Sequence, residues 1–260
     1  MYRILNTKVL FLVVILMVTI SGCSLKKDHS LTPEEYRKLG IPGPQKIWTN
    51  QDFLRAQEAL SGLRARNFLS LPRKGSQKSG TVYDRMLNKE NLSYVNDTSI
   101  LISDRAFQIM YFSIFFADLD RMYTDNLKTE QFYKDELIDI CIFRLFVQGK
   151  MLELAGKIMN STDPSSVGMR SGGQAVASGY SKLIFKALEE QVKFKTYRTR
   201  DLERLSMEVS QSLNENLKWI DFAEKQKIVA EIRNVIEKSP PKSIKNNYRK
   251  ILEVFQGENN

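Results

Sequence analysis

The sequence predicts an all-α fold, a single irregular bundle of seven or eight helices in which an aromatic-rich helix is buried at the centre. Three observations support this fold class. From Ser103 onward, apolar residues recur at the three- and four-residue spacing of a helix face. The alternating segment at residues 99–102 is too short to build a sheet. The sequence contains no visible internal repeat of about 34 residues, so it gives no support to a helical solenoid.

The helical domain is expected to span residues 32–257. Its first helix is predicted to begin after Thr32, whose hydroxyl can cap the first turn, with Pro33 at the position that suits its backbone. A second helix is predicted at residues 51–66 from an apolar stripe. Residues 68–80 are expected to form a loop, because serine and glycine are frequent there.

Residues 104–123 are predicted to form the central helix. Aromatic and aliphatic side chains occupy all sides of this segment, which is typical of a helix buried within a bundle. A membrane-spanning helix is the alternative, but Arg105, Gln108 and Asp118 leave an apolar run that is too short to cross a bilayer.

Residues 130–160 are predicted to form a long helix with a seam of heptad spacing. Gly149 and Gly156 lie two turns apart on this seam. Because glycine costs about 1 kcal/mol relative to alanine inside a helix, we expect both positions to be sites of close helix packing. The small residues of segment 168–179 are expected to supply the facing surface, as they lead into a helix that ends near Phe194.

Three further helices are predicted near the C-terminus, at about residues 200–216, 218–238 and 243–256. Thr199 and Asp201 suit the start of the first helix, and the Pro240-Pro241 pair separates the last two.

Residues 1–22 have the pattern of a secretory signal peptide, with basic residues before an apolar run and small residues after it. The tetrad Ile20-Ser21-Gly22-Cys23 resembles the lipobox of bacterial lipoproteins. That resemblance implies cleavage before Cys23, attachment of diacylglycerol to its sulfur, and a lipidated tether at residues 23–31. An uncleaved membrane anchor is the alternative.

The resemblance also implies a place in the bacterial cell envelope, with the membrane as a partner through the lipid anchor. If the host is Gram-negative, the expected location is the outer membrane, facing the periplasm. Removing residues 1–22 lowers the formal net charge from +9 to about +7. For an exported protein, this charge favours a partner protein or an anionic envelope surface and not nucleic acid.

No catalytic or metal-binding constellation is found in the sequence, and no cofactor is expected. The single histidine, His29, excludes a Ser-His-Asp triad and a multi-histidine metal site. Cys141 lies among apolar residues, which predicts burial. A cell-wall-active enzyme that uses a single Glu or Asp as general acid is the alternative function.

Basic residues concentrate in three stretches, at residues 64–78, 191–200 and 237–253. The first is favoured as the surface that binds a partner or an anionic envelope surface, because its cations lie on a segment expected to be mobile. The candidate binding residues are Arg64, Arg66, Arg73, Lys74 and Lys78. The sequence therefore predicts a membrane-anchored envelope lipoprotein that acts as a non-enzymatic binding or scaffold module.

Overall fold

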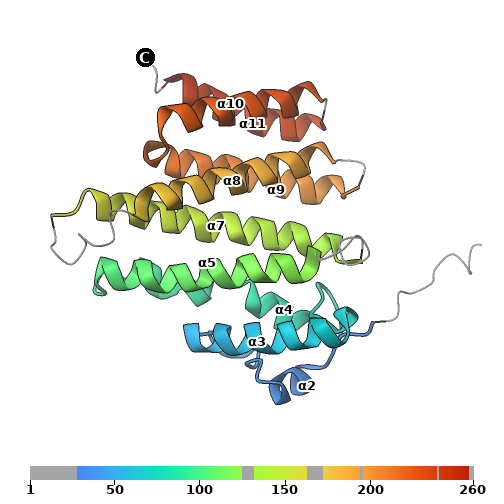
Figure 1. The fold of residues 1–260 in the computed structure, drawn as a ribbon. Coiled ribbons are helices and arrows are strands. Elements are labelled where there is room, and N and C mark those ends of the chain that lie inside the picture. Colours follow the sequence, from blue (N-terminus) through green and yellow to red (C-terminus); the bar gives the residue numbers. More distant parts are fainter. Residues whose placement is uncertain (1–27, 125–131, 163–171, 194–195, 239, 258–260) are drawn as a thin grey trace, which may run out of the picture.

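The computed structural model describes residues 28–124, 132–162, 172–193, 196–238 and 240–257. Within these ranges the chain forms nine α-helices and no strand, so the predicted all-α fold is confirmed. The long helices form a stacked array that follows the order of the sequence, from α3 (Asn50–Arg66) toward one edge to α11 (Lys242–Gly257) at the other (Figure 1). The predicted signal peptide, Cys23 and the tether before residue 28 lie outside the described residues.

Two capping boxes begin the first helices. In α2 (Pro33–Lys38), Thr32 Oγ1 accepts a hydrogen bond from the Glu35 backbone N–H, and the Glu35 side chain accepts one from the Thr32 N–H. Thr49 and Asp52 make the same pair of bonds at the start of α3. These bonds satisfy N–H groups that no helical carbonyl can reach, which is why each helix begins directly after a threonine.

A short helix, α4 (Gly80–Met86), accounts for the one helix beyond the eight that helical periodicity predicts. Its N-cap residue, Ser79, makes no side-chain capping bond. The helix is instead held by burial of Val82, Tyr83 and Met86, and the Tyr83 hydroxyl donates to the Glu136 carbonyl oxygen at 3.1 Å. Tertiary contacts therefore fix α4. The flanking 3-10 turns are η1 (Phe68–Ser70) and η2 (Lys89–Asn96).

The centre of the array is α7 (Lys134–Met159). It contacts α5 (Ile102–Thr124) on one side and both α8 (Gly173–Val192) and α9 (Thr199–Asn216) on the other. Its buried side chains divide between two hydrophobic clusters: Phe143 and Val147 join the N-terminal one, whereas Leu145 and Leu152 join the C-terminal one. The helix with two buried faces is therefore α7.

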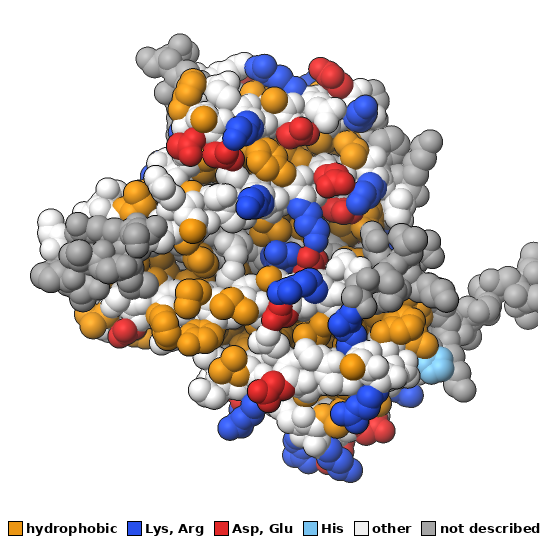
Figure 2. All heavy atoms as spheres, viewed as in Figure 1, with side chains coloured by type: hydrophobic (Ala, Val, Ile, Leu, Met, Phe, Trp, Pro, Cys, Tyr) orange, Lys and Arg blue, Asp and Glu red, His pale blue; other side chains and the backbone are white. Residues whose placement is uncertain are grey.

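The prediction that residues 104–123 form a helix is confirmed, but its central burial holds for one face only. Phe112 and Phe116 of α5 are buried, whereas Phe107 is 51% exposed and Ile114 is 48% exposed. Figure 2 shows hydrophobic side chains gathered over the left part of α5, below the edge of the grey atoms. None of the described helices combines the length and the hydropathy needed to cross a membrane.

The C-terminal part consists of two helical layers. The first contains α8 and α9, and the second contains α10 (Phe222–Glu237) and α11, with α10 packed on α8 and α11 packed on α9. The predicted helix at 218–238 is interrupted, because η4 (Leu217–Trp219) ends before α10 begins. Asp221 caps α10 by accepting a hydrogen bond from the Glu224 N–H at 2.9 Å.

One buried carboxylate joins three of these helices. Asp120 of α5 is 6% exposed and is paired with Arg144 of α7 and Lys186 of α8. The Lys186 Nζ lies 2.6 Å from Asp120 Oδ2. This cluster fixes the relative position of α5, α7 and α8, because a charge this deeply buried is costly unless it stays paired.

Candidate functional site

The direction of the helices brings part of each of the three basic stretches of the sequence to one end of the array. Successive long helices from α7 to α11 run in alternating directions, so every second turn lies at the same end (Figure 1). The end of α8 and the start of α9 lie on the right in this view, as do the end of α10, the start of α11 and the C-terminal end of α3.

The loop after α3 is fastened to the start of α7. Lys74 Nζ lies 2.7 Å from Asp139 Oδ2, and the Lys74 backbone N–H donates to Glu136 Oε1 at 3.0 Å. Arg73 Nε lies 3.7 Å from the same Glu136 oxygen, and its guanidinium lies 4.3 Å from the centre of the Phe132 ring. Arg73 and Lys74 therefore form ion pairs with acids of α7 and are not free cations of this loop.

Glu136 is the residue that holds this loop. It is 2% exposed, and burial raises the pKa of its carboxyl even though Arg73 and the Lys74 N–H act in the opposite direction. Its carboxylate is therefore an internal anchor for two of the five predicted binding residues, and the sequence pattern of the loop gives no sign of it.

The first described residues of the chain also lie at this loop. The Ser76 hydroxyl donates to Asp28 Oδ2 at 2.5 Å, and Lys78 Nζ donates to the Asp28 carbonyl oxygen at 3.5 Å. Although burial acts in the opposite direction, hydrogen bonds from Ser30 and Ser76 lower the pKa of Asp28. The segment that follows the predicted lipidation site thus enters the folded domain beside the basic loop.

The other two basic stretches are connected to the same place by polar contacts. Arg204 Nη1 in the first turns of α9 lies 2.8 Å from Asp139, the acid that also binds Lys74. The Ser243 hydroxyl at the start of α11 donates to Glu203 Oε1 at 2.5 Å. These contacts form a chain from the basic loop through α9 to α11. We call residues 64–78, 196–204 and 240–245 the cationic end.

Several cations of the cationic end point into solvent. Arg66, Lys78, Arg200 and Lys242 are exposed, and none of them has an ion pair with a carboxylate of the described residues. Arg66 donates only to the Gly62 carbonyl of its own helix, and Arg64 is half-buried. The structure thus divides the predicted binding residues: Arg66 and Lys78 are available to an external anion, whereas Arg73 and Lys74 are paired internally.

Gly149 and Gly156 lie where neighbouring side chains approach α7 closely. A Cβ atom at Gly156 would lie 2.2 Å from the Trp219 ring, and one at Gly149 would lie 3.0 Å from Asn216 Nδ2. These neighbours come from η4 and α9, not from segment 168–179, of which residues 168–171 lie outside the described residues. What approaches the glycines is therefore an indole ring and an amide, and not a second small-residue helix face.

Carboxylates in pockets bear on the alternative of a cell-wall enzyme. Glu208 lines a pocket of about 180 Å³, and burial raises the pKa of its carboxyl, with the nearby Lys89 acting against this shift. The Lys89 Nζ lies 3.8 Å from Glu208 Oε1. Asp84 lines a larger pocket of about 340 Å³, and burial raises the pKa of its carboxyl as well. A general-acid mechanism could therefore use Glu208, which has a cation beside it, or Asp84.

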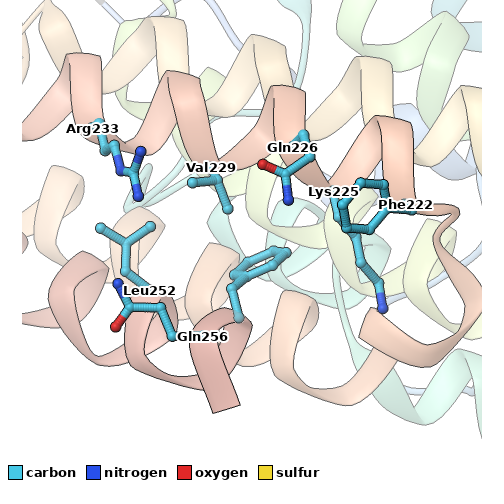
Figure 3. A pocket seen from close by; sticks show the side chains of 8 residues that line it. Phe222, Lys225, Gln226, Val229, Arg233, Leu252 and Gln256 are labelled. Carbon is cyan, nitrogen blue, oxygen red and sulfur yellow. The ribbon is translucent and has the colours of Figure 1, made fainter. Parts of the chain in front are cut away.

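A second small pocket lies between α10 and α11 (Figure 3). It has a volume of about 110 Å³, and its side chains include Phe222, Val229 and Leu252, with Arg233 above the Leu252 side. No acidic side chain lines it. This slot therefore offers no carboxylate for a general-acid mechanism.

Among the described residues, no group of three or more His, Cys, Asp and Glu side chains is arranged to hold a metal ion. Cys141 is buried, as predicted.

Comparisons of the chain with protein-family models, with curated proteins and with solved structures found no match.

Proposed function

We propose that this protein is a lipid-anchored envelope lipoprotein whose cationic end binds an anionic membrane surface, so that the helical array acts as a non-enzymatic binding module. The observation that carries the proposal is the contact of Asp28 with Ser76 and Lys78. It brings the chain that follows the predicted lipid attachment at Cys23 to the same end as the exposed cations.

The two features act together on membrane binding. The diacylglycerol that the lipobox resemblance implies carries two acyl chains, which hold a protein at a membrane far better than a single chain does. Each Lys or Arg near an anionic surface adds about 1 kcal/mol. The lipid supplies the attachment, and the cationic end sets which side of the domain faces the headgroups.

Vesicle binding by the unlipidated chain, residues 24–260, tests the electrostatic part. We expect sedimentation with vesicles of anionic phospholipid and little with neutral phosphatidylcholine. Replacing Lys78 and Lys242 with Gln should weaken anionic binding roughly thirtyfold, from about 1 kcal/mol per charge. The matched control replaces Lys182 and Lys250 with Gln. Both lysines are exposed and lie outside the cationic end, and neither has an ion pair with a carboxylate of the described residues. Equal loss in the control would show that net charge acts, and not the cationic end.

Labelling in a bacterial host tests the anchor. Radiolabelled palmitate should be incorporated into the wild-type chain and not into Cys23→Ala, and the variant should keep its leader. If the Cys23→Ala chain matures to the same size and remains with the envelope, the lipid anchor is refuted.

The cell-wall-active enzyme is the second candidate, and it is favoured by two carboxylates that line pockets and have a raised pKa, Glu208 and Asp84. A zymogram on purified cell wall tests it. Clearing by the wild type that is lost in Glu208→Gln would show that the protein is an enzyme and not a binding module.

A protein scaffold is a different outcome. It would be favoured over a module that binds the membrane surface if a variant that no longer binds anionic vesicles still captures a protein partner.

A further inference from the structure

The largest hollow among the pockets described lies at the end of the array opposite the cationic end. It has a volume of about 530 Å³ and is formed where the last turn of α7, the first turns of α8, η4 and the start of α10 meet. Leu152, Met159, Ala177 and Trp219 supply its apolar walls. The volume is within the range of about 300–1,000 Å³ that is typical of small-molecule sites.

Two glycines keep this cavity open. At Gly156, a Cβ atom would lie 2.2 Å from the Trp219 ring, and at Gly173 it would lie 2.4 Å from Met159 Sδ. Because Gly156 and Gly173 have no side chain, Trp219 can lie directly against the α7 backbone and Met159 directly against the α8 backbone. The space that these two large side chains would otherwise occupy remains part of the cavity. The glycine that appears in the heptad seam thus serves to shape a pocket wall.

Three charged residues line the cavity, Lys218 and the two acids Asp221 and Glu224, and the lysine is the group that could bind an anion. Lys218 is exposed, its Nζ lies 4.9 Å from the Trp219 ring centre, and no carboxylate of the described residues pairs with it. The two acids that line the cavity are already engaged. Asp221 accepts the capping hydrogen bond of α10, and Glu224 Oε1 lies 2.7 Å from Lys227 Nζ.

The start of α8 adds to this positive potential. Gly172 provides no side-chain cap, and the first turn of this 20-residue helix contains no acid. Helix N-termini carry a partial positive charge that attracts anions. The α8 terminus and Lys218 therefore present positive charge to a cavity lined by both apolar and polar side chains.

We propose that this cavity binds a small apolar carboxylate, such as a medium-chain fatty acid. The hydrocarbon packs against Leu152, Met159 and Trp219, and the carboxylate is bound by Lys218 at the rim. The inference does not depend on lipidation or on the cationic end, because every residue involved belongs to the opposite end of the domain.

Intrinsic fluorescence of residues 24–260 offers a direct measurement. The chain has two tryptophans, and Trp48 is fully buried, so a ligand in the cavity should change the emission of Trp219 alone. Decanoate, decanol and decyltrimethylammonium are titrated separately below their aggregation limits. We expect decanoate to bind more tightly than decanol, and decyltrimethylammonium to bind weakest. Trp219→Phe should abolish the signal while calorimetry still detects binding.

Variants separate the charge from the cavity. Lys218→Gln should weaken decanoate binding about tenfold, as expected for loss of a charge-assisted hydrogen bond, and leave decanol unchanged. Lys250→Gln, an exposed lysine of α11 that does not line the cavity, is the matched control. Ala177→Phe should abolish binding of all three probes. If that chain does not fold, Ser178→Phe blocks the cavity from an exposed position.

Equal affinities for the three probes would overturn the proposal, as would the absence of binding by decanoate. Binding that persists in a folded Ala177→Phe or Ser178→Phe chain would place the ligand elsewhere and would also overturn it.

Discussion

The contact between Gly156 and Trp219 leads to a stability prediction that compares two glycines. Gly156 lies in the last turn of α7 and Gly179 lies in the interior of α8. A Cβ atom at Gly156 would lie 2.2 Å from the Trp219 ring, whereas one at Gly179 would meet nothing within 4 Å. The substitutions Gly156→Ala and Gly179→Ala are therefore chemically identical but differ in the space available.

The structure sets the expected magnitudes. Replacing an unhindered helical glycine with alanine should stabilise the chain by up to about 1 kcal/mol, which is the expectation for Gly179→Ala. Overpacking costs about 1–3 kcal/mol, because a rigid indole cannot yield as the end of a flexible side chain can. Gly156→Ala should thus range from neutral to about 2 kcal/mol destabilised, at least about 1 kcal/mol below Gly179→Ala.

Urea unfolding of residues 24–260, followed by circular dichroism, measures both values. Comparable slopes in the two variants would show that the difference lies in stability and not in the compactness of the unfolded state. In a second measurement, the emission of Trp219 should shift in folded Gly156→Ala and remain unchanged in Gly179→Ala. If Gly156→Ala is stabilised as much as Gly179→Ala, the indole does not lie against α7 and the description of the cavity wall is wrong.

Three other expectations concern buried polar groups. Burial raises the pKa of Glu136 above its ordinary value of 4.5, so the native chain holds this proton more tightly than the unfolded chain does. The contribution of Glu136 to the free energy of unfolding is therefore greatest below pH 4.5 and falls as the pH rises through the raised pKa. When urea midpoints are measured from pH 4.5 upward, they should decline less in Glu136→Gln than in the wild type. Burial raises the pKa of Cys141 to about 12, so iodoacetamide at pH 8 should label this thiol only after unfolding, and labelling of the native chain would contradict its burial. Asp120→Asn should lower the free energy of unfolding by about 1–3 kcal/mol, because Arg144 and Lys186 would lose their shared carboxylate but are partly screened by solvent. An unchanged urea midpoint would show that the cluster does not contribute to stability.

The sequence predicts most helices correctly, because capping residues and apolar stripes are local signals. Thr32 and Thr49 each occupy the N-cap of the helix that follows. The short helix α4 escapes prediction for the opposite reason. It has no side-chain cap, and its buried residues are stabilised by contacts with residues more than fifty positions away, such as the bond from Tyr83 to Glu136.

Part of the cationic end follows from the sequence through the direction of the helices. Short connections between helices favour antiparallel neighbours, and alternating directions bring every second turn to one end. The stretches around Arg200 and Lys242 follow from that rule. The internal pairing of Arg73 and Lys74 does not, because it depends on Glu136 and Asp139 of another helix.

Composition alone could not identify the central helix. The segments that became α5 and α7 are both rich in apolar residues, and the more aromatic one, α5, leaves Phe107 and Ile114 exposed. The difference arises from the number of neighbours that pack against each helix, which is a property of the whole array.

The sharing of α7 between the two hydrophobic clusters also determines how the domain comes apart. When no helix is shared between two hydrophobic clusters, one cluster can unfold while the other stays folded, and hydrogen exchange then detects two separate units. Here Phe143 and Leu145 belong to different clusters although they are two residues apart on one helix. Neither half can release α7 without exposing the other half to water, so the core amides of both halves are expected to lose protection in one cooperative event.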